Sequence, residues 1–285
     1  MNFRIFCTVI CLFFCSASFE QTPEESAPPP PFVYQRDFKT ILDQTLDRNS
    51  DWYYHKLIIR FLNDDTSLTK MDVLALMIGF TENPHYKPLE DMETEQEIFE
   101  LNKQAEFAEV IHKSKPFLQT HPLNLLVLRE ISFAYNRMSM AFSKRSVLDS
   151  SILYKDSSDY FMNLNDKIME AMIYSGKGKK AESAIFSLGL ADGEYFIPNV
   201  GFTIDKKDTQ WAKNGDFMEV IESVTAEGVK INFYFVIQHA KLKIDDDMAN
   251  QLPAKKTKKD LKKKEKVKKA NPAMPINVEE TPKQP

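Results

Sequence analysis

Apolar residues in the first half of the chain recur at helical spacing. Between Asp37 and Leu46 they return every three or four positions, which predicts a helix with Asp37 as its N-cap. The same spacing predicts helices over residues 52–62, 71–78, 93–113, 122–135 and 150–174. Thr69 followed by Asp72 resembles a capping box, and Gly79 suits the end of that helix. This half therefore predicts helix hairpins, compatible with a tetratricopeptide-like arrangement although no 34-residue period is present.

The pattern changes after Ser175-Gly176-Lys177-Gly178, which we expect to end the last long helix and turn into a strand. Short β-branched or aromatic segments predict strands over residues 184–188, 195–197, 217–221 and 229–236. Ala226-Glu227-Gly228 suits a hairpin turn between the last two. The sequence thus predicts an α+β fold, in which an N-terminal helical part is followed by a small antiparallel β-sheet packed on it.

Residues 1–18 resemble a secretory signal peptide, with Arg4 followed by an apolar run over residues 5–15. As a helix this run would span about 16 Å, too short for a hydrocarbon core of about 30 Å. We therefore expect an exported protein, periplasmic or secreted, with no transmembrane helix in the mature chain. All three cysteines lie within this segment, so the mature chain has no disulfides. Lipid anchoring at Cys15 is disfavoured because the bulky Phe14 precedes it.

Composition and charge divide the rest of the chain. With 285 residues, 43% apolar and 27% charged, the protein falls in the globular class. Residues 19–32 contain four successive prolines and predict a spacer, residues 33–247 a single α+β domain, and residues 248–285 a disordered lysine-rich tail. The tail carries ten lysines within residues 255–269, whereas residues 33–254 carry 25 basic and 34 acidic side chains. Such a tail is either simply solvated, paired with its own acidic body, or in contact with an anionic surface such as lipid headgroups or polysaccharide.

Several short motifs run through the predicted domain. They are Tyr53-Tyr54-His55-Lys56-Leu57, Arg60-Phe61, Asp65-Thr66-Ser67-Leu68-Thr69, Gly79-Phe80, Tyr86-Lys87-Pro88, Ser175-Gly176-Lys177-Gly178, Glu194-Tyr195, Gln210 and Tyr234-Phe235. Together they resemble the domain-of-unknown-function 4919 family, which consists of exported, uncharacterised proteins of Gram-negative bacteria. The chain departs from the family pattern at Lys177, where the family has an aspartate, and at Met77-Ile78, where the family has aromatic residues. The resemblance implies no reaction, ligand or partner.

No motif predicts catalysis, a cofactor or a metal. The five histidines lack the spacing of a zinc site, and no Gly-x-Ser-x-Gly segment marks a nucleophile. Residues 175–180 lack the four-residue spacing between glycines of a phosphate-binding loop, and residues 63–67 lack the alternating acids of an EF-hand. The aromatic clusters at residues 52–54 and 233–235 are explained by core packing or by an aromatic face that binds a glycan or peptide.

The function is unknown from sequence, and the interpretation we favour is a non-catalytic exported or cell-envelope binding module whose partner is an envelope protein or polysaccharide. The alternative is an exported hydrolase whose active site no motif reveals, which a pocket holding titratable groups with shifted pKa values would favour. Candidate ligand-binding residues are the polar residues of the family-like motifs: Arg60, Asp65, Thr69, Tyr86, Glu194 and Gln210. Each also has a structural interpretation, since Arg60 can pair with Asp65, Thr69 can cap a helix and Tyr86 can pack in the core.

Overall fold

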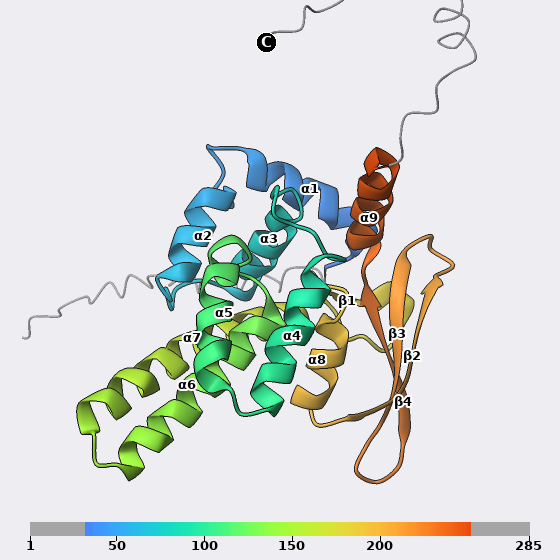
Figure 1. Cartoon of the computed structure of the whole chain (residues 1–285). Helices are drawn as coiled ribbons and strands as arrows, with labels where there is room; N and C mark the ends of the chain where they lie inside the picture. Colours follow the sequence, from blue (N-terminus) through green and yellow to red (C-terminus); the bar gives the residue numbers. More distant parts are fainter. Residues whose placement is uncertain (1–31, 252–285) are drawn as a thin grey trace, which may run out of the picture. The chain divides into compact units, whose positions relative to one another are not determined.

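The computed structural model describes residues 32–251. The predicted signal peptide, the proline-rich spacer, Cys15 and the lysines of the predicted tail lie outside the described residues. Within the described range the fold is α+β, with helices first and a sheet afterwards (Figure 1). None of the helices in this range is both long and apolar enough to cross a bilayer.

The helices follow one another with short connections. They are α1 (Tyr34–Leu46), α2 (Tyr54–Leu62), α3 (Lys70–Phe80), α4 (Asp91–Lys103), α5 (Phe107–Thr120), α6 (Leu125–Lys144), α7 (Leu148–Ser175), α8 (Asp192–Asn199) and α9 (Gln238–Gln251), with a short 3₁₀ turn, η1 (Ala181–Ser183). The predicted capping box is confirmed at α3, where the Thr69 side chain accepts from the amide of Asp72 and the Asp72 carboxylate accepts from that of Thr69. Every residue of α3 from Val73 to Phe80 is buried, and this helix forms the centre of the helical part.

The sheet contains β1 (Ile185–Phe186), β2 (Thr203–Trp211), β3 (Phe217–Val224) and β4 (Lys230–Val236) in the order β1-β4-β3-β2. Strands β2, β3 and β4 form an antiparallel meander, and Gly228 has a φ of 82° in the predicted turn between the last two. Strand β1 pairs with β4 in parallel, so the sheet is mixed rather than purely antiparallel. The reason is that β1 follows α7 and is joined to β4 only through α8 and the meander.

One predicted strand is wrong. Residues 195–197 lie in α8, whose buried Phe196 and Ile197 pack inward although both residue types favour strands. Helix α8 contacts α6 and strands β2 and β3, so tertiary packing overrides local preference here. In Figure 1 α8 lies between α4 and the sheet.

Two elements escaped prediction because they are polar. Strand β2 is almost entirely exposed and rich in lysine and aspartate, as suits the edge of a sheet that must not pair with another chain. Helix α9 has a weak apolar pattern, although its Ala240 is fully buried.

Helix boundaries also differ from prediction, and α6 extends nine residues past the predicted end at Tyr135. The helix predicted over residues 93–113 is two helices, because Ala105 takes a φ of 61° and ends α4 with a turn in which the amide of Glu106 bonds to the carbonyl of Leu101. Helix α1 is capped by Val33 rather than Asp37, since the chain is already helical at Tyr34. The Asp37 carboxylate instead reaches back to the amide of Val33 at 2.7 Å.

Candidate functional site

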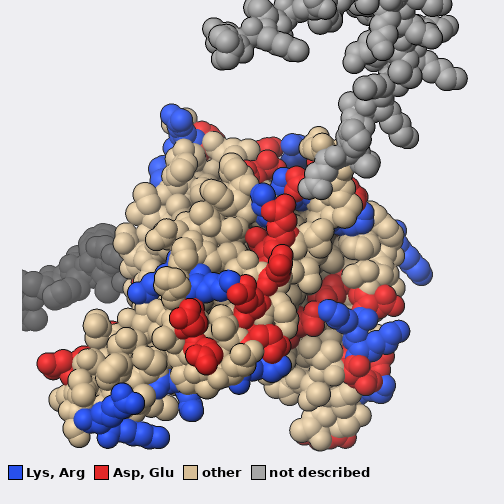
Figure 2. Space-filling model, in the orientation of Figure 1, with Lys and Arg blue, Asp and Glu red and all other residues tan. Residues whose placement is uncertain are grey.

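A cleft of about 510 Å³ opens where the helices meet the edge of the sheet. Its lining comes from α4 (Met92, Glu95, Gln96, Phe99), α6 (Leu126, Arg129), α8 and the residue before it (Ala191, Glu194, Tyr195, Pro198) and β2 (Ile204, Lys207). We call it the α4–α8 cleft. Figure 2, in the orientation of Figure 1, shows acidic side chains gathered over α4 along one wall. Apolar and aromatic surfaces thus lie beside charged and hydrogen-bonding groups in a single hollow.

Glu95 forms the inner end of the cleft. The helical period places it with the buried Ile98 and Asn102, and it is only 6% exposed. Its Oε1 accepts a hydrogen bond of 2.6 Å from the amide group of Asn124, whose Oδ1 caps α6. Burial raises the pKa of Glu95 to about 7, and the nearby Asp192 adds to the shift, while the Asn124 bond opposes it. The cleft therefore contains a carboxyl group that exchanges a proton near neutral pH.

The mouth of the cleft carries paired and unpaired charges. Glu194 of α8 forms an ion pair with Lys207 of β2, which ties the helix to the edge strand. Arg129 of α6 is partly exposed, and within residues 32–251 no hydrogen bond or ion pair holds its guanidinium group. Its five N–H donors are therefore available to a ligand.

The cleft continues along the surface into a second hollow of about 260 Å³, lined by Phe99, Asn102, Lys103, Arg129, Glu130 and Phe133. Phe99 and Arg129 line both hollows. Phe133 is 45% exposed, so its ring adds an accessible apolar surface. The two hollows together form an elongated groove rather than a closed pocket.

Behind Glu95 lies a small cavity of about 20 Å³, enough for one water molecule. Its polar lining includes Tyr86, Asp91, His121 and Asp192 as well as Glu95. His121 Nε2 lies 3.2 Å from an Asp91 oxygen. Burial lowers the pKa of His121, but Asp91 together with the carbonyls of Phe117 and His85 outweighs it, and the net shift is upward. Asp192 is buried at the start of α8, where its carboxylate accepts from the amide of Gly189 at 2.7 Å, and burial raises its pKa to about 6.

A third buried carboxyl group lies beneath α8. Strand alternation points Glu219 of β3 to the same face as Ile221 and Ser223, and it is 3% exposed. Among the described residues, its Oε2 has no hydrogen-bond partner. Burial raises the pKa of Glu219 to about 8, the negative charge of Glu194 raises it further, and Lys207 opposes the shift. Gly193 makes room for this group, because a Cβ there would lie 2.4 Å from Oε2.

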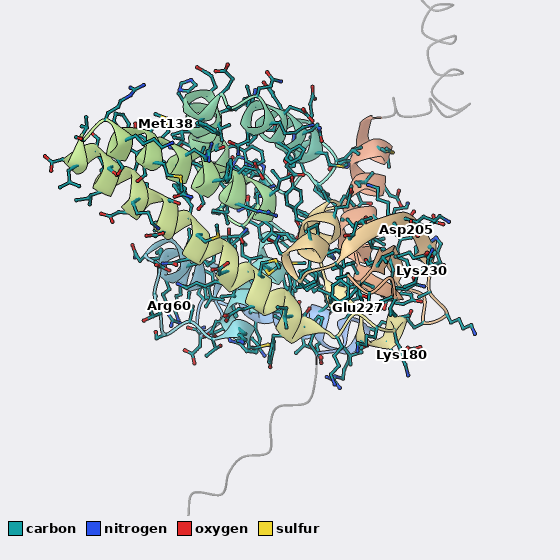
Figure 3. All side chains as sticks on the ribbon, turned by 90° about the horizontal axis from the view of Figure 1, so that it is seen from below. Arg60, Met138, Lys180, Asp205, Glu227 and Lys230 are labelled. Carbon is teal, nitrogen blue, oxygen red and sulfur yellow. The ribbon has the colours of Figure 1, made fainter. Side chains whose placement is uncertain are left out.

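The candidate residues from the sequence fall in three separate places. Arg60 and Asp65 form an ion pair of 2.8 Å with Ser67 beside it, next to the Thr69 cap, on the helical side away from Asp205 and Lys230 of the sheet (Figure 3). This confirms the structural interpretations of that pair and of the Thr69 cap.

Two candidates lie near the cleft. Tyr86 is buried and donates to the carbonyl of Leu188 at 2.8 Å, and it lines the small cavity behind Glu95. Glu194 lines the α4–α8 cleft itself. Gln210 is exposed on β2, opposite Met218, and does not line the cleft.

Sequence reasoning missed Glu95, Arg129 and Glu219. A signal for the two glutamates was present, because helical and strand periods place each on an apolar face where a charged residue is unusual. Arg129 carries no such signal, since a single exposed arginine on a helix is ordinary. Within the described residues, no group of three or more His, Asp or Glu side chains could hold a metal ion.

Comparison with known proteins places the chain in a family. A family model described as "Domain of unknown function (DUF4919)" matches residues 39–246, most of the chain. The chain belongs to the DUF4919 family. No curated protein and no solved structure matches it. The α4–α8 cleft of this DUF4919 member lies entirely within the matched range.

The chemistry available in this DUF4919 cleft is binding combined with proton exchange. Aromatic and apolar walls can cover one face of a ligand, and Gln96 and Arg129 can bond to its polar groups. Glu95 can donate or accept a proton near pH 7.

Proposed function

We propose that this DUF4919 member is an exported binding module that holds a carbohydrate chain in the α4–α8 cleft. The observation that carries the proposal is the lining of the cleft, in which Tyr195 and Phe99 lie beside Gln96 and Arg129. Sugar rings present one apolar face and a rim of hydroxyl groups, so this combination of walls suits them. The export segment predicted from the sequence would bring the protein to envelope polysaccharides.

Charge and shape favour a neutral, elongated ligand. The Glu194–Lys207 ion pair removes one charge of each sign from the mouth, and the carboxyl of Glu95 is half protonated near neutral pH. The unpaired charge of Arg129 is then opposed only by the partly ionised Glu95, so the cleft has at most a small excess of charge with which to select an ionic ligand. The continuation past Phe99 and Arg129 into the second hollow extends the contact beyond a single sugar unit.

Removing the Arg129 guanidinium should weaken carbohydrate binding. We expect Arg129→Gln to raise the dissociation constant between about tenfold and a hundredfold, because a hydrogen bond from a charged group contributes about 1.5–3 kcal/mol. The measurement is isothermal titration calorimetry with neutral linear tetrasaccharides, including one of N-acetylglucosamine, supported by co-sedimentation with peptidoglycan sacculi. The matched control is Arg145→Gln, at the C-cap of the same helix and outside the lining of both hollows, which should bind as the unaltered protein does. Equal affinities for the two variants would count against this site.

A second candidate function, an exported glycoside hydrolase, is supported by the two carboxyl groups in one cleft. Glu95 is buried and keeps a proton near pH 7, whereas Glu194 is held beside a lysine. In glycosidases, such a difference in surroundings lets one carboxyl group keep its proton and act as the proton donor while the other acts as a carboxylate. In this hypothesis Glu95 would protonate the leaving oxygen as the glycosidic bond breaks, and the Glu194 carboxylate would take the proton of the water that adds to the anomeric carbon.

The hydrolase hypothesis predicts that Glu95→Gln lowers the rate at which reducing ends are released from a bound oligosaccharide by at least about a hundredfold. Binding should persist, because the amide keeps the shape of the protonated carboxyl. Glu93→Gln, on the exposed side of α4, is the control and should keep the full rate. If the unaltered protein binds the oligosaccharide and cleaves none of it between pH 5 and 8, the binding module alone remains.

A further inference from the structure

The long hairpin of α6 and α7 projects away from the rest of the described structure and ends in a free tip. Helix α6 ends at Lys144 and α7 begins at Leu148, and 20 residues of α6 correspond to about 30 Å. Figure 3 shows the hairpin, with Met138 labelled on it, extending away from the end that carries Asp205 and Lys230.

The two helices are fastened to each other up to this tip. Ser139 Oγ donates to the carbonyl of Ser151 at 2.7 Å, and Ser151 Oγ donates back to the carbonyl of Ser139 at 3.1 Å. The ring of Phe142, one turn closer to the end of α6 than Ser139, packs against the ring of Tyr154 on α7, with centroids 5.1 Å apart. The tip therefore lies at the end of two helices that contact each other directly, and not on an isolated loop.

Apolar side chains stand exposed around this tip. They lie in the last two turns of α6, the connection and the first two turns of α7: Met140 at 49%, Val147 at 43%, Leu148 at 67%, Ile152 at 51% and Leu153 at 65% exposed. Single exposed apolar residues are ordinary, but a group this dense marks an interaction surface.

The charge of the tip distinguishes it from the rest of the domain. Residues 137–156 carry four basic side chains against two carboxylates, Asp149 and Asp156, whereas residues 33–254 as a whole are acidic. Figure 2 shows Lys and Arg side chains at the free end of the hairpin. Within residues 32–251, neither Lys144 nor Arg145 has an ion-pair partner, while Lys155 pairs with Asp159.

We propose that this tip is a contact site for an anionic lipid bilayer, on which the leucine and isoleucine side chains enter the interface and Lys144 and Arg145 meet the headgroups. Apolar side chains next to unpaired basic ones are the combination that interfacial membrane contacts use. The acidic remainder would be repelled by the same surface, so the hairpin would approach it end-on. The inference is independent of what the α4–α8 cleft binds.

The test uses a fluorophore whose emission reports lipid contact at one position. In the full chain with Cys7, Cys11 and Cys15 replaced by serine, Leu148→Cys is labelled with a nitrobenzoxadiazole group. We expect a several-fold rise and a blue shift of its emission on vesicles of phosphatidylglycerol and phosphatidylcholine, and little change on phosphatidylcholine alone. Adding Lys144→Glu and Arg145→Glu should lower the apparent lipid affinity at this label by about tenfold or more.

The control label is placed at Ile59→Cys on α2, which is 60% exposed and lies outside the hairpin. This label should stay in water even if another segment, such as the N-terminal run or the lysine-rich tail, also brings the chain to the vesicle. The proposal is overturned if the chain sediments with vesicles while the Leu148 label reports water. It is equally overturned if both labels respond alike, or if the chain does not bind the anionic vesicles.

Discussion

Replacing Gly176 with alanine should destabilise the protein by roughly 3 kcal/mol or more, or prevent its folding. A Cβ at this position would lie 2.3 Å from the carbonyl oxygen of Ala184 and 2.6 Å from that of Ser183. Both are backbone atoms, which cannot rotate away as the end of a side chain can. The φ of Gly176 is −176°, so the cost comes from this crowding and not from the backbone angle.

The crowding has wide consequences because this turn attaches the sheet to the helices. The side chain of Ser175 accepts from the amide of Phe186 at 2.8 Å, and the carbonyl of Gly178 accepts from the amide of Tyr234 at 2.8 Å. Urea unfolding followed by circular dichroism measures the effect. Lys177→Ala is the control in the same turn, since Lys177 is exposed, and it should change the midpoint little. A Gly176→Ala protein as stable as the control would show that the turn does not hold the sheet in this way.

The stability of the protein should fall as the pH rises from about 4 to about 8. The folded protein keeps protons on Asp192, Glu95 and Glu219 up to about pH 6, 7 and 8, whereas the unfolded chain loses them near the ordinary values of 3.8 and 4.5. The folded state therefore binds more protons across this window, and a rise in pH favours unfolding.

On the acid side the buried His239 acts in the opposite direction. Its ring stacks on Phe186 at 4.7 Å, and burial lowers its pKa from 6.5 to about 4. The unfolded chain takes up this proton first, so the contribution of His239 to stability is lost as the pH falls from about 6.5 to 4. One histidine offsets only part of the three carboxyl contributions, so the net stability still falls as the pH rises.

Glu219→Gln removes the carboxyl group that we expect to lower the free energy of unfolding most as the pH rises. An amide resembles the protonated carboxyl in shape and cannot ionise, so this variant should match the unaltered protein near pH 4 and exceed its stability at pH 9 by roughly 2–4 kcal/mol. Glu222→Gln, on the same strand but paired with the exposed Lys230, should keep the original pH dependence. The measurement is the urea midpoint as a function of pH. A flat profile in the unaltered protein would contradict the burial of these carboxyl groups.

Local chemistry made much of the fold predictable. The Thr69 and Asp72 capping box, the turn at Gly228 and the Arg60–Asp65 pair each depend on residues close in sequence, and all three are present. The α+β class followed from the change of hydrophobic period after Gly178. Residues 195–197 were assigned wrongly because packing of Phe196 and Ile197 under the helices decides their conformation, and no local pattern shows that.

The candidate site was less accessible to sequence reasoning because it is assembled from four distant elements. Glu95 gains its raised pKa from burial and from the negative charge of Asp192, almost a hundred residues away, against the opposing hydrogen bond from Asn124. Of the residues expected to bind a ligand, Glu194 alone lines the α4–α8 cleft, since Arg60, Asp65 and Thr69 are occupied with one another or with the backbone. Family-like motifs thus marked structural positions more often than cleft positions.

The most direct test of carbohydrate binding in the cleft is the change in backbone amide chemical shifts when the protein is saturated with the tetrasaccharide that binds it best. We predict that the largest changes fall on residues 92–99, 126–129, 191–198 and 204–207, the four segments that line the α4–α8 cleft. Changes that cluster elsewhere, or none in these segments at saturation, would contradict the account.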